Sequence, residues 1–239
     1  MFIGGLQKFT MLDYPGKIAA VIFTIGCNFY CPFCHNPELV DPKKIDHENE
    51  IKENDVLKFL RSRKGDLEGV CITGGEPTLQ PDLKEFVKKI KKMGFFVKVD
   101  TNGSYPDIVS RLIKDNMVDY WAIDVKTTPQ KYKIMAKDNI TENIERSIKL
   151  ITDSKSELEL RTTVLPGYVN QGDFDEMIDW INEIDKNIFP KLFRYSIQNF
   201  RPEKTLHNGF EKVKPYEKEE LDKMSEKLKK YCGNVVVLD

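Results

Sequence analysis

The hydrophobic pattern of the chain alternates between two kinds of segment from about Lys17 to about Cys232. Short runs of β-branched or aromatic residues, typical of buried strands, are each followed by a longer stretch with apolar residues at helical spacing. The predicted strands cover residues 18–24, 69–73, 95–100, 119–125, 157–164 and 191–198. The predicted helices cover residues 54–63, 81–93, 105–114, 142–152, 174–184 and 216–231.

Successive strand–helix units cross over right-handedly and build a parallel sheet. Six such units predict an α/β fold, a partial (β/α)6 barrel with a curved parallel sheet, helices outside and one side left open. The 239 residues contain no repeat, low-complexity tract or flexible linker, so we expect a single domain over residues 1–239. In such folds ligands bind at the carboxyl ends of the strands.

Charge and hydropathy narrow the classes of partner. The 37 basic and 38 acidic residues give a net charge of -1, which provides no reason to expect nucleic acid. Residues 1–8 lack the pattern of a leader and no apolar run reaches 18 residues, so we expect no membrane association and a cytoplasmic location. Five cysteines, three of them within eight residues, favour a metal site in a reducing compartment over a disulfide framework.

Cys27, Cys31 and Cys34 follow the first predicted strand with the spacing C-x3-C-x2-C. Soft thiolate ligands on one loop favour zinc or an iron-sulfur cluster. A structural zinc site requires four protein ligands, and a ferredoxin-type cluster requires four cysteines. One interpretation therefore takes a fourth ligand from elsewhere in the chain, and its candidates are His35, His47, His207, Cys71 and Cys232. The other interpretation leaves one iron open for an exogenous ligand.

With Phe33 just before the last cysteine, this loop resembles that of the radical S-adenosylmethionine (SAM) superfamily. Within that superfamily, the sequence CHNP at residues 34–37 resembles the glycyl-radical-enzyme activating proteins. The arrangement looks closest to the activating proteins of anaerobic ribonucleoside-triphosphate reductase, which residues 4–9 and 13–16 also fit, and is similar to the pyruvate formate-lyase activating enzymes. The resemblance covers nearly the whole chain and is weak after Pro166.

The resemblance implies a radical SAM oxidoreductase whose chemistry belongs to its cofactors. The three cysteines bind one 4Fe-4S cluster, and SAM binds the iron that they leave open. Reductive cleavage of SAM gives a 5'-deoxyadenosyl radical, which takes a hydrogen atom from a glycine Cα of a partner glycyl-radical enzyme under anaerobic conditions. The implied partner is an anaerobic ribonucleotide reductase or a pyruvate formate-lyase-like enzyme, and the implied electron donor is a flavodoxin or ferredoxin. No catalytic acid or base is required on this chain.

The motifs at the other strand ends supply the expected SAM contacts. Gly74 and Gly75 follow the second predicted strand, where the lack of a Cβ lets the backbone approach a ligand. Asp124 and Lys126 are two residues apart at the end of the fourth strand and share one face. The full set of expected contacts is Phe33, His35, Gly74, Gly75, Glu76, Asp124, Val125 and Lys126, and then Asp100, Thr101, Asn102, Arg161 and Gln198. The aspartates would also help to hold a monovalent cation.

Several interpretations stay open from the sequence. Arg161 lies in an otherwise apolar strand and has two equally good positions, a surface salt bridge or an inward position facing the SAM carboxylate. An alternative function keeps the radical SAM chemistry but acts on a small molecule or nucleotide. An alternative of another class is a non-catalytic iron-sulfur or zinc protein.

Overall fold

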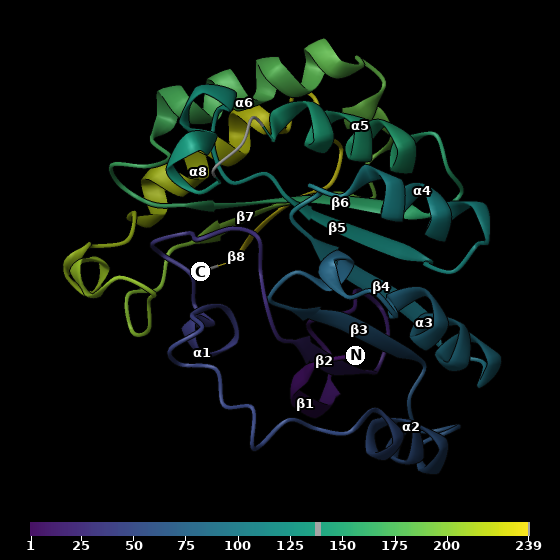
Figure 1. Cartoon of the computed structure of the whole chain (residues 1–239). Coiled ribbons are helices and arrows are strands. Elements are labelled where there is room, and N and C mark those ends of the chain that lie inside the picture. Colours follow the sequence, from purple (N-terminus) through teal and green to yellow (C-terminus); the bar gives the residue numbers. More distant parts are fainter. Residues whose placement is uncertain (137–139, 239) are drawn as a thin grey trace.

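In the computed structural model, which describes residues 1–136 and 140–238, the strands form one curved sheet of eight strands (Figure 1). The strands lie side by side in their order along the chain: β1 (Ile3–Thr10), β2 (Ala19–Thr24), β3 (Gly69–Gly74), β4 (Phe96–Thr101), β5 (Tyr120–Asp124), β6 (Glu157–Val164), β7 (Arg194–Asn199) and β8 (Val235–Leu238). β1 pairs antiparallel with β2, and all later neighbours are parallel. The sheet is curved but open, with β1 and β8 at its two ends.

Helices connect the parallel strands and cover the outer face of the sheet (Figure 1). Their bounds are α1 (Pro37–Val40), α2 (Glu53–Ser62), α3 (Leu83–Lys92), α4 (Pro106–Lys114), α5 (Thr141–Thr152), α6 (Gln171–Ile184), α7 (Ile188–Lys191) and α8 (Lys218–Leu228). Each long helix buries an apolar stripe; α3, for example, buries Leu83, Phe86, Val87 and Ile90. The predicted α/β fold, a partial barrel with a curved parallel sheet and outer helices, is confirmed.

The two faces of the sheet differ in polarity. In β4, Val97 and Val99 belong to the apolar core under the helices, whereas Lys98 and Asp100 line cavities on the inner face. β6 alternates in the same way, because Leu158 and Leu160 are in the core while Glu159 and Arg161 face inward. Successive side chains of a strand point to opposite faces. The inner face of this sheet is therefore polar, which suits a bound polar ligand better than a packed interior.

The strands predicted from the sequence correspond to β2 through β7, and two strands were not predicted. β1 contains two glycines and a lysine, and β8 has only four residues, so neither has the long apolar run of a central strand. The sixth predicted strand was wrong at its start, because residues 188–191 form the short helix α7 and β7 begins at Arg194. The other boundaries differ by a few residues.

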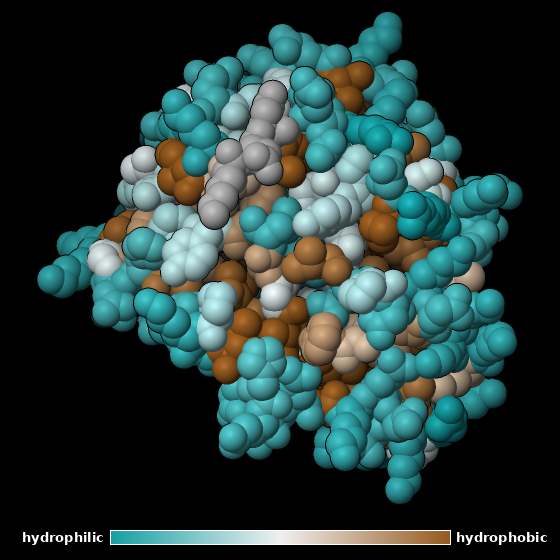
Figure 2. Space-filling model, viewed as in Figure 1, coloured by the Kyte–Doolittle hydropathy of each residue, from teal (hydrophilic) through white to brown (hydrophobic). Residues whose placement is uncertain are grey.

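The surface is largely hydrophilic around the periphery of the face in Figure 2, and hydrophobic residues are exposed nearer its middle. Across residues 1–136 and 140–238, every helix is too short or too polar to span a membrane.

Candidate functional site

A cavity of about 400 Å³ lies at the carboxyl ends of the parallel strands. It is lined by the cysteine loop, by the segments that follow β3, β4 and β5, and by the inner faces of β6 and β7. The residues predicted from the sequence that line it are Cys27, Cys31, Phe33, Cys34, His35, Gly74, Gly75, Glu76, Asp100, Thr101, Asn102, Asp124, Lys126, Arg161 and Gln198. The structure therefore brings these residues from distant parts of the chain to one place.

Val125 is the exception among the predicted contacts. Its side chain is fully buried in the core under the helices, and its backbone N–H donates to the Arg161 carbonyl oxygen at 2.8 Å. Because Asp124 and Lys126 face the cavity, the side chain between them points to the opposite face of the chain. The Val125 side chain therefore has no position from which to contact a ligand in this cavity.

The cysteine loop is fixed at both ends by backbone hydrogen bonds. Gly26 N–H donates to the Leu39 carbonyl at 2.7 Å, and Glu76 N–H donates to the Gly26 carbonyl at 2.8 Å. Farther along the loop, the Pro32 carbonyl accepts from His207 N–H at 3.0 Å. Burial raises the pKa of all three thiols, to about 12 for Cys27 and about 11 for Cys31. A metal centre bound to the sulfurs would offset the cost of burying a thiolate and would let these thiols ionise.

Asn28 also positions this loop, and the sequence analysis missed it. Its Nδ2 donates to Ser104 Oγ at 2.9 Å, and its Oδ1 accepts from Asn102 Nδ2 at 2.9 Å. The two bonds join the cysteine loop to the loop after β4. An asparagine beside a cysteine in a loop has no distinctive sequence pattern, so no signal pointed to this role.

The paired glycines have a structural reason that differs from the one expected. A Cβ on Gly75 would lie 2.0 Å from the Gly26 carbonyl oxygen, and a Cβ on Gly74 would lie 2.5 Å from Thr24 N. Gly74 also has a φ of +107°, which L side chains rarely adopt. The glycines thus let the segment after β3 pack directly against the base of the cysteine loop.

The Glu76 carboxylate is buried and accepts several hydrogen bonds. Thr78 donates its N–H at 3.0 Å and also its hydroxyl, Thr101 Oγ1 donates at 2.6 Å, and Asn102 N–H donates at 2.7 Å. Burial raises the pKa of Glu76, although these donors act in the opposite direction. The carboxylate is therefore held rigidly at the wall of the cavity, where it can orient a cationic group.

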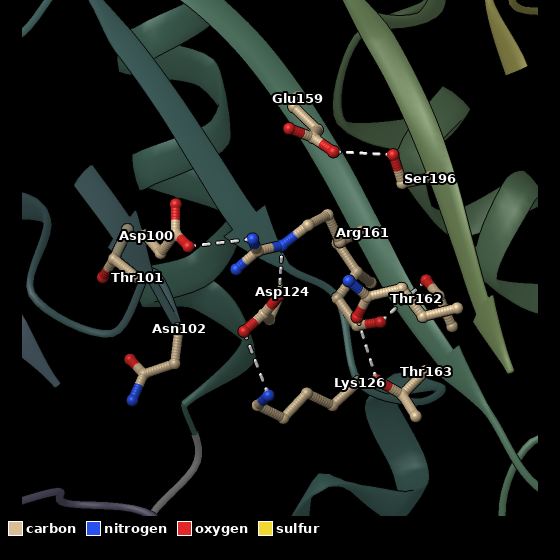
Figure 3. Close-up of polar contacts among 12 residues, drawn as sticks. Asp100, Thr101, Asn102, Asp124, Lys126, Glu159, Arg161, Thr162, Thr163 and Ser196 are labelled. Carbon is tan, nitrogen blue, oxygen red and sulfur yellow. Dashed lines mark hydrogen bonds and ion pairs between the residues drawn. The ribbon is translucent and has the colours of Figure 1, made fainter. Parts of the chain in front are cut away.

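A chain of alternating charges crosses the inner face of the sheet, and Figure 3 shows Asp100, Arg161, Asp124 and Lys126 of it. Lys98 contacts Asp100, whose other oxygen accepts from Arg161 Nη1 at 2.9 Å. Arg161 Nε donates to Asp124 Oδ1 at 2.8 Å, and Lys126 Nζ lies 3.3 Å from Asp124 Oδ2. Each aspartate thus lies between two cationic side chains. We call these five residues the charge chain.

The charge chain settles the position of Arg161. It faces inward, and its side chain is only 14% exposed, so the surface salt bridge is wrong. Burial alone would raise the pKa of Asp124, but Arg161 and Lys126 lower it from 3.8 to about 2. The predicted cation site at the aspartates gains no support, because both oxygens of Asp100 and of Asp124 already contact cationic side chains.

Phe33 and His35 pack among aromatic residues at the rim of the cavity. The Phe33 ring lies 6.0 Å from Tyr168 and 6.4 Å from Phe210, centroid to centroid. The His35 ring stacks on Phe200 at 5.7 Å, and its Nε2 lies 2.9 Å from the Arg201 carbonyl oxygen. Both rings therefore have protein partners that explain their positions without a ligand.

The candidates for a fourth metal ligand lie mostly elsewhere. His47, His207, Cys71 and Cys232 do not line the cavity, and the ring of His35 already bonds a carbonyl. In the described part of the chain, no three His, Cys, Asp or Glu side chains are gathered closely enough to hold a single metal ion. Three thiols spread around one cavity fit a cluster of several irons better than one zinc ion.

Residues 21–181 match the family described as "Radical SAM superfamily". The chain belongs to this superfamily. Its relatives include a Methanocaldococcus jannaschii protein named as a candidate glycyl-radical enzyme activating enzyme, 33% identical over 98% of this chain and 95% of that protein. The pyruvate formate-lyase-activating enzyme of Staphylococcus aureus is 25% identical over 86% of this chain and 85% of its own length. A candidate GTP 3',8-cyclase of Pyrococcus horikoshii is 25% identical over 81% of this chain and 64% of that protein.

Solved structures show the same fold at low identity. Streptococcus suis SuiB bound to its precursor peptide SuiA superposes with a TM-score of 0.63 and 17% identity, over 92% of this chain and 48% of that chain. A domain of a pyruvate-formate lyase-activating enzyme from Bacteroides vulgatus has a TM-score of 0.51 and 16% identity, over 72% of this chain and 99% of that chain. The predicted resemblance is confirmed: this protein is a radical SAM enzyme, related to glycyl-radical enzyme activating enzymes.

Membership of the superfamily implies a 4Fe-4S cluster and SAM as cofactors. The residues at the cavity fit both groups. Three thiols from one loop line a cavity of about 400 Å³, and a rigid carboxylate and a charged wall face the same space. The interpretation as a non-catalytic zinc protein is therefore set aside.

Proposed function

We propose that this enzyme activates a glycyl-radical enzyme under anaerobic conditions, by generating a glycyl radical in its partner. The observation that supports the proposal most is the match to the Methanocaldococcus jannaschii protein, which runs almost from end to end of both chains. In this proposal the enzyme works as one cytoplasmic domain. Its partner is an anaerobic ribonucleotide reductase or a pyruvate formate-lyase-like enzyme, and a flavodoxin or ferredoxin supplies electrons.

In this proposal Cys27, Cys31 and Cys34 hold the cluster at the mouth of the partial barrel. When bound there, the cluster would supply the electron for reductive cleavage of SAM. Glu76 faces the cavity as a fixed carboxylate and would orient the ammonium group of SAM. The ion pairs of the charge chain give the cavity wall fixed dipoles. These dipoles can interact with a bound charged ligand without any rearrangement of the side chains during the reaction.

Lys126 is placed to complement the cysteine loop. Its ammonium ion interacts with Asp124 and, at longer range, with the thiols of Cys31 and Cys34. Burial disfavours the charge, yet these neighbours raise the pKa of Lys126 overall, so the residue stays cationic. A fixed positive charge beside several thiolates would stabilise the negatively charged site.

The proposal is tested with protein reconstituted anaerobically with iron and sulfide. After reduction, 5'-deoxyadenosine is expected from SAM, and a glycyl signal is expected by electron paramagnetic resonance once the partner is added. Absence of 5'-deoxyadenosine from protein with a full cluster would contradict the radical SAM assignment. A radical SAM activity without any glycyl signal on either partner class would contradict the activating function alone.

The ligand assignment has its own test. Each of Cys27→Ala, Cys31→Ala and Cys34→Ala should abolish cluster assembly, measured as bound iron and visible absorption. Cys71→Ala and Cys232→Ala are the controls and should assemble the cluster, because both thiols lie outside the cavity. Equal loss of iron in all five variants would contradict the assignment of Cys27, Cys31 and Cys34 as the cluster ligands.

A nucleotide substrate is the second candidate, because two relatives are named as GTP 3',8-cyclases. This chain covers only 64% and 51% of those two proteins. The match to the Methanocaldococcus jannaschii protein covers 95% of that protein, so the activating function has the more extensive match behind it. Incubating the reduced enzyme with SAM and GTP distinguishes the two, because only a cyclase would consume GTP.

A further inference from the structure

A second, larger cavity of about 770 Å³ opens on the side of the barrel. One wall is the loop of residues 11–16, and the other is formed by β7 and the end of β8. Its lining includes five residues that also line the first cavity: Asp13, His35, Arg161, Thr163 and Gln198. The second cavity therefore adjoins the candidate cofactor site along these residues.

The outer edge of β8 borders this opening. β8 stands at the end of the sheet, where it pairs with β7 (Figure 1). Val235 lies opposite Tyr195, and the Tyr195 N–H donates to the Asn234 carbonyl at 2.9 Å. In a parallel pair, a residue of one strand bonds to the two residues that flank its opposite number on the other strand. The backbone groups of Asn234 and Val236, which flank Val235, therefore face β7. The backbone N–H and C=O groups of Val235 and Val237 consequently face the free edge.

β8 is short, but it carries none of the residue types that usually keep a free strand from pairing. Its sequence is Val-Val-Val-Leu, without proline, charge or glycine, and its first three residues are half-buried. Such an edge is a template for another extended chain. Across the cavity, Met11 is 66% exposed and Leu12 is 86% exposed. The opening thus offers free backbone groups on one side and apolar side chains on the other, which suits an extended polypeptide.

Arg194 lies inside the same opening and provides further hydrogen-bond donors. Its Nε forms an ion pair with Glu159 at 2.8 Å, and Glu159 also accepts from Tyr120 Oη at 2.8 Å. Glu159 accepts a further bond from Ser196 Oγ at 2.6 Å, which Figure 3 shows. These contacts fix the buried carboxylate and hold the guanidinium at the cavity wall. A guanidinium has five N–H donors, which suit the carbonyl oxygens of a peptide.

We propose that an extended segment of the protein substrate adds to the free edge of β8 and continues through the second cavity to the candidate cofactor site. The proposal rests on the proposed function, which requires that a polypeptide reach the first cavity. The five residues shared by the two cavities bring a segment on β8 next to the first cavity. A second copy of this chain on the same edge would instead obstruct the side opening.

The test compares two substitutions at one position of the cluster-loaded enzyme. Val237→Pro removes an N–H that faces the free edge and leaves the ladder to β7 intact, and proline is tolerated at such edge positions. Val237→Ala removes side-chain atoms but keeps the N–H, so it controls for lost packing. The probes are a ribonucleotide reductase and a pyruvate formate-lyase-like enzyme from the same genome, both in the radical-free form. We expect Val237→Pro to weaken binding of the radical-free partner that the wild-type enzyme activates about tenfold, and Val237→Ala to have little effect.

Two further readouts separate the possible results. Both variants should cleave SAM without partner at the wild-type rate, because Val237 does not line the first cavity. Hydrogen exchange of the Val235 and Val237 amides in the wild type should slow at least about tenfold when the partner binds. This second measurement does not depend on how well the proline variant folds.

Each outcome decides between the proposals. Partner binding with unchanged exchange at Val235 and Val237, or equal binding by the proline and alanine variants, overturns docking on β8 and leaves the proposed function standing. Protection that depends on enzyme concentration and not on partner assigns the edge to a second copy of this chain, which also overturns it. No binding and no glycyl signal with wild-type enzyme overturns the proposed function and the docking proposal together.

Discussion

Arg161→Met tests whether the charge chain stabilises the protein as described. The substitution keeps an apolar side chain in the site but leaves Asp100 and Asp124 with one cationic neighbour each, Lys98 and Lys126. The displacement of the Asp124 pKa from 3.8 to about 2 corresponds to about 2 kcal/mol. Breaking a buried ion pair by removing one partner costs about 3–5 kcal/mol. Because the lysines remain, we expect the free energy of unfolding to fall by about 2–3 kcal/mol, or Tm by about 4–12 °C.

The measurement is urea unfolding of the cluster-free chain, with Arg63→Met as the matched control. Arg63 lies 3.6 Å from Asp66 in a pair whose side chains are 52% and 70% exposed, so its loss should cost less than about 1 kcal/mol. The Asp124 contribution is present above about pH 4 and is lost as the pH falls toward 2, because the pKa is depressed in the folded state. The deficit of Arg161→Met should therefore shrink in acid. A deficit no larger than that of Arg63→Met at neutral pH would refute the reasoning.

Two other substitutions test how the cysteine loop is held. Asn28→Ala removes both side-chain bonds to the loop after β4, and should lower the free energy of unfolding by about 1–3 kcal/mol and reduce bound iron after reconstitution; unchanged iron would count against a positioning role. Gly75→Ala places a Cβ 2.0 Å from the Gly26 carbonyl oxygen and should prevent stable folding or cluster assembly. Gly209→Ala has no atom within 4 Å of the added carbon, so it should melt like the wild type.

The central strands were predictable because both of their faces are covered or enclosed. Strands such as β3 and β5 are buried along most of their length, and buried parallel strands give near-continuous apolar runs. The edge strands lack this constraint: β1 has a mostly exposed or half-exposed middle, and β8 is half-buried. Their pairing depends on neighbours far along the chain, which local patterns do not reveal.

The cavity residues were predictable mainly where a motif or a family resemblance named them. Lys98 was missed, although a lysine two residues before Asp100 in an otherwise apolar strand is a recognisable signal of an inward polar face. Asn28 had no such signal, because its role depends on Ser104, which lies 76 residues away. Val125 was included with its neighbours, but strand alternation places its side chain on the covered face.

The cysteine loop is braced by a part of the chain that is made much later than the loop itself. The Pro32 carbonyl accepts from His207, and the His35 ring bonds the carbonyl of Arg201, 166 residues farther on. At about 5–20 residues per second, synthesis of that interval takes roughly 10–30 s. During translation the three thiols thus emerge well before their brace, so iron delivery to a correctly shaped loop has to wait until Arg201 and His207 have left the ribosome.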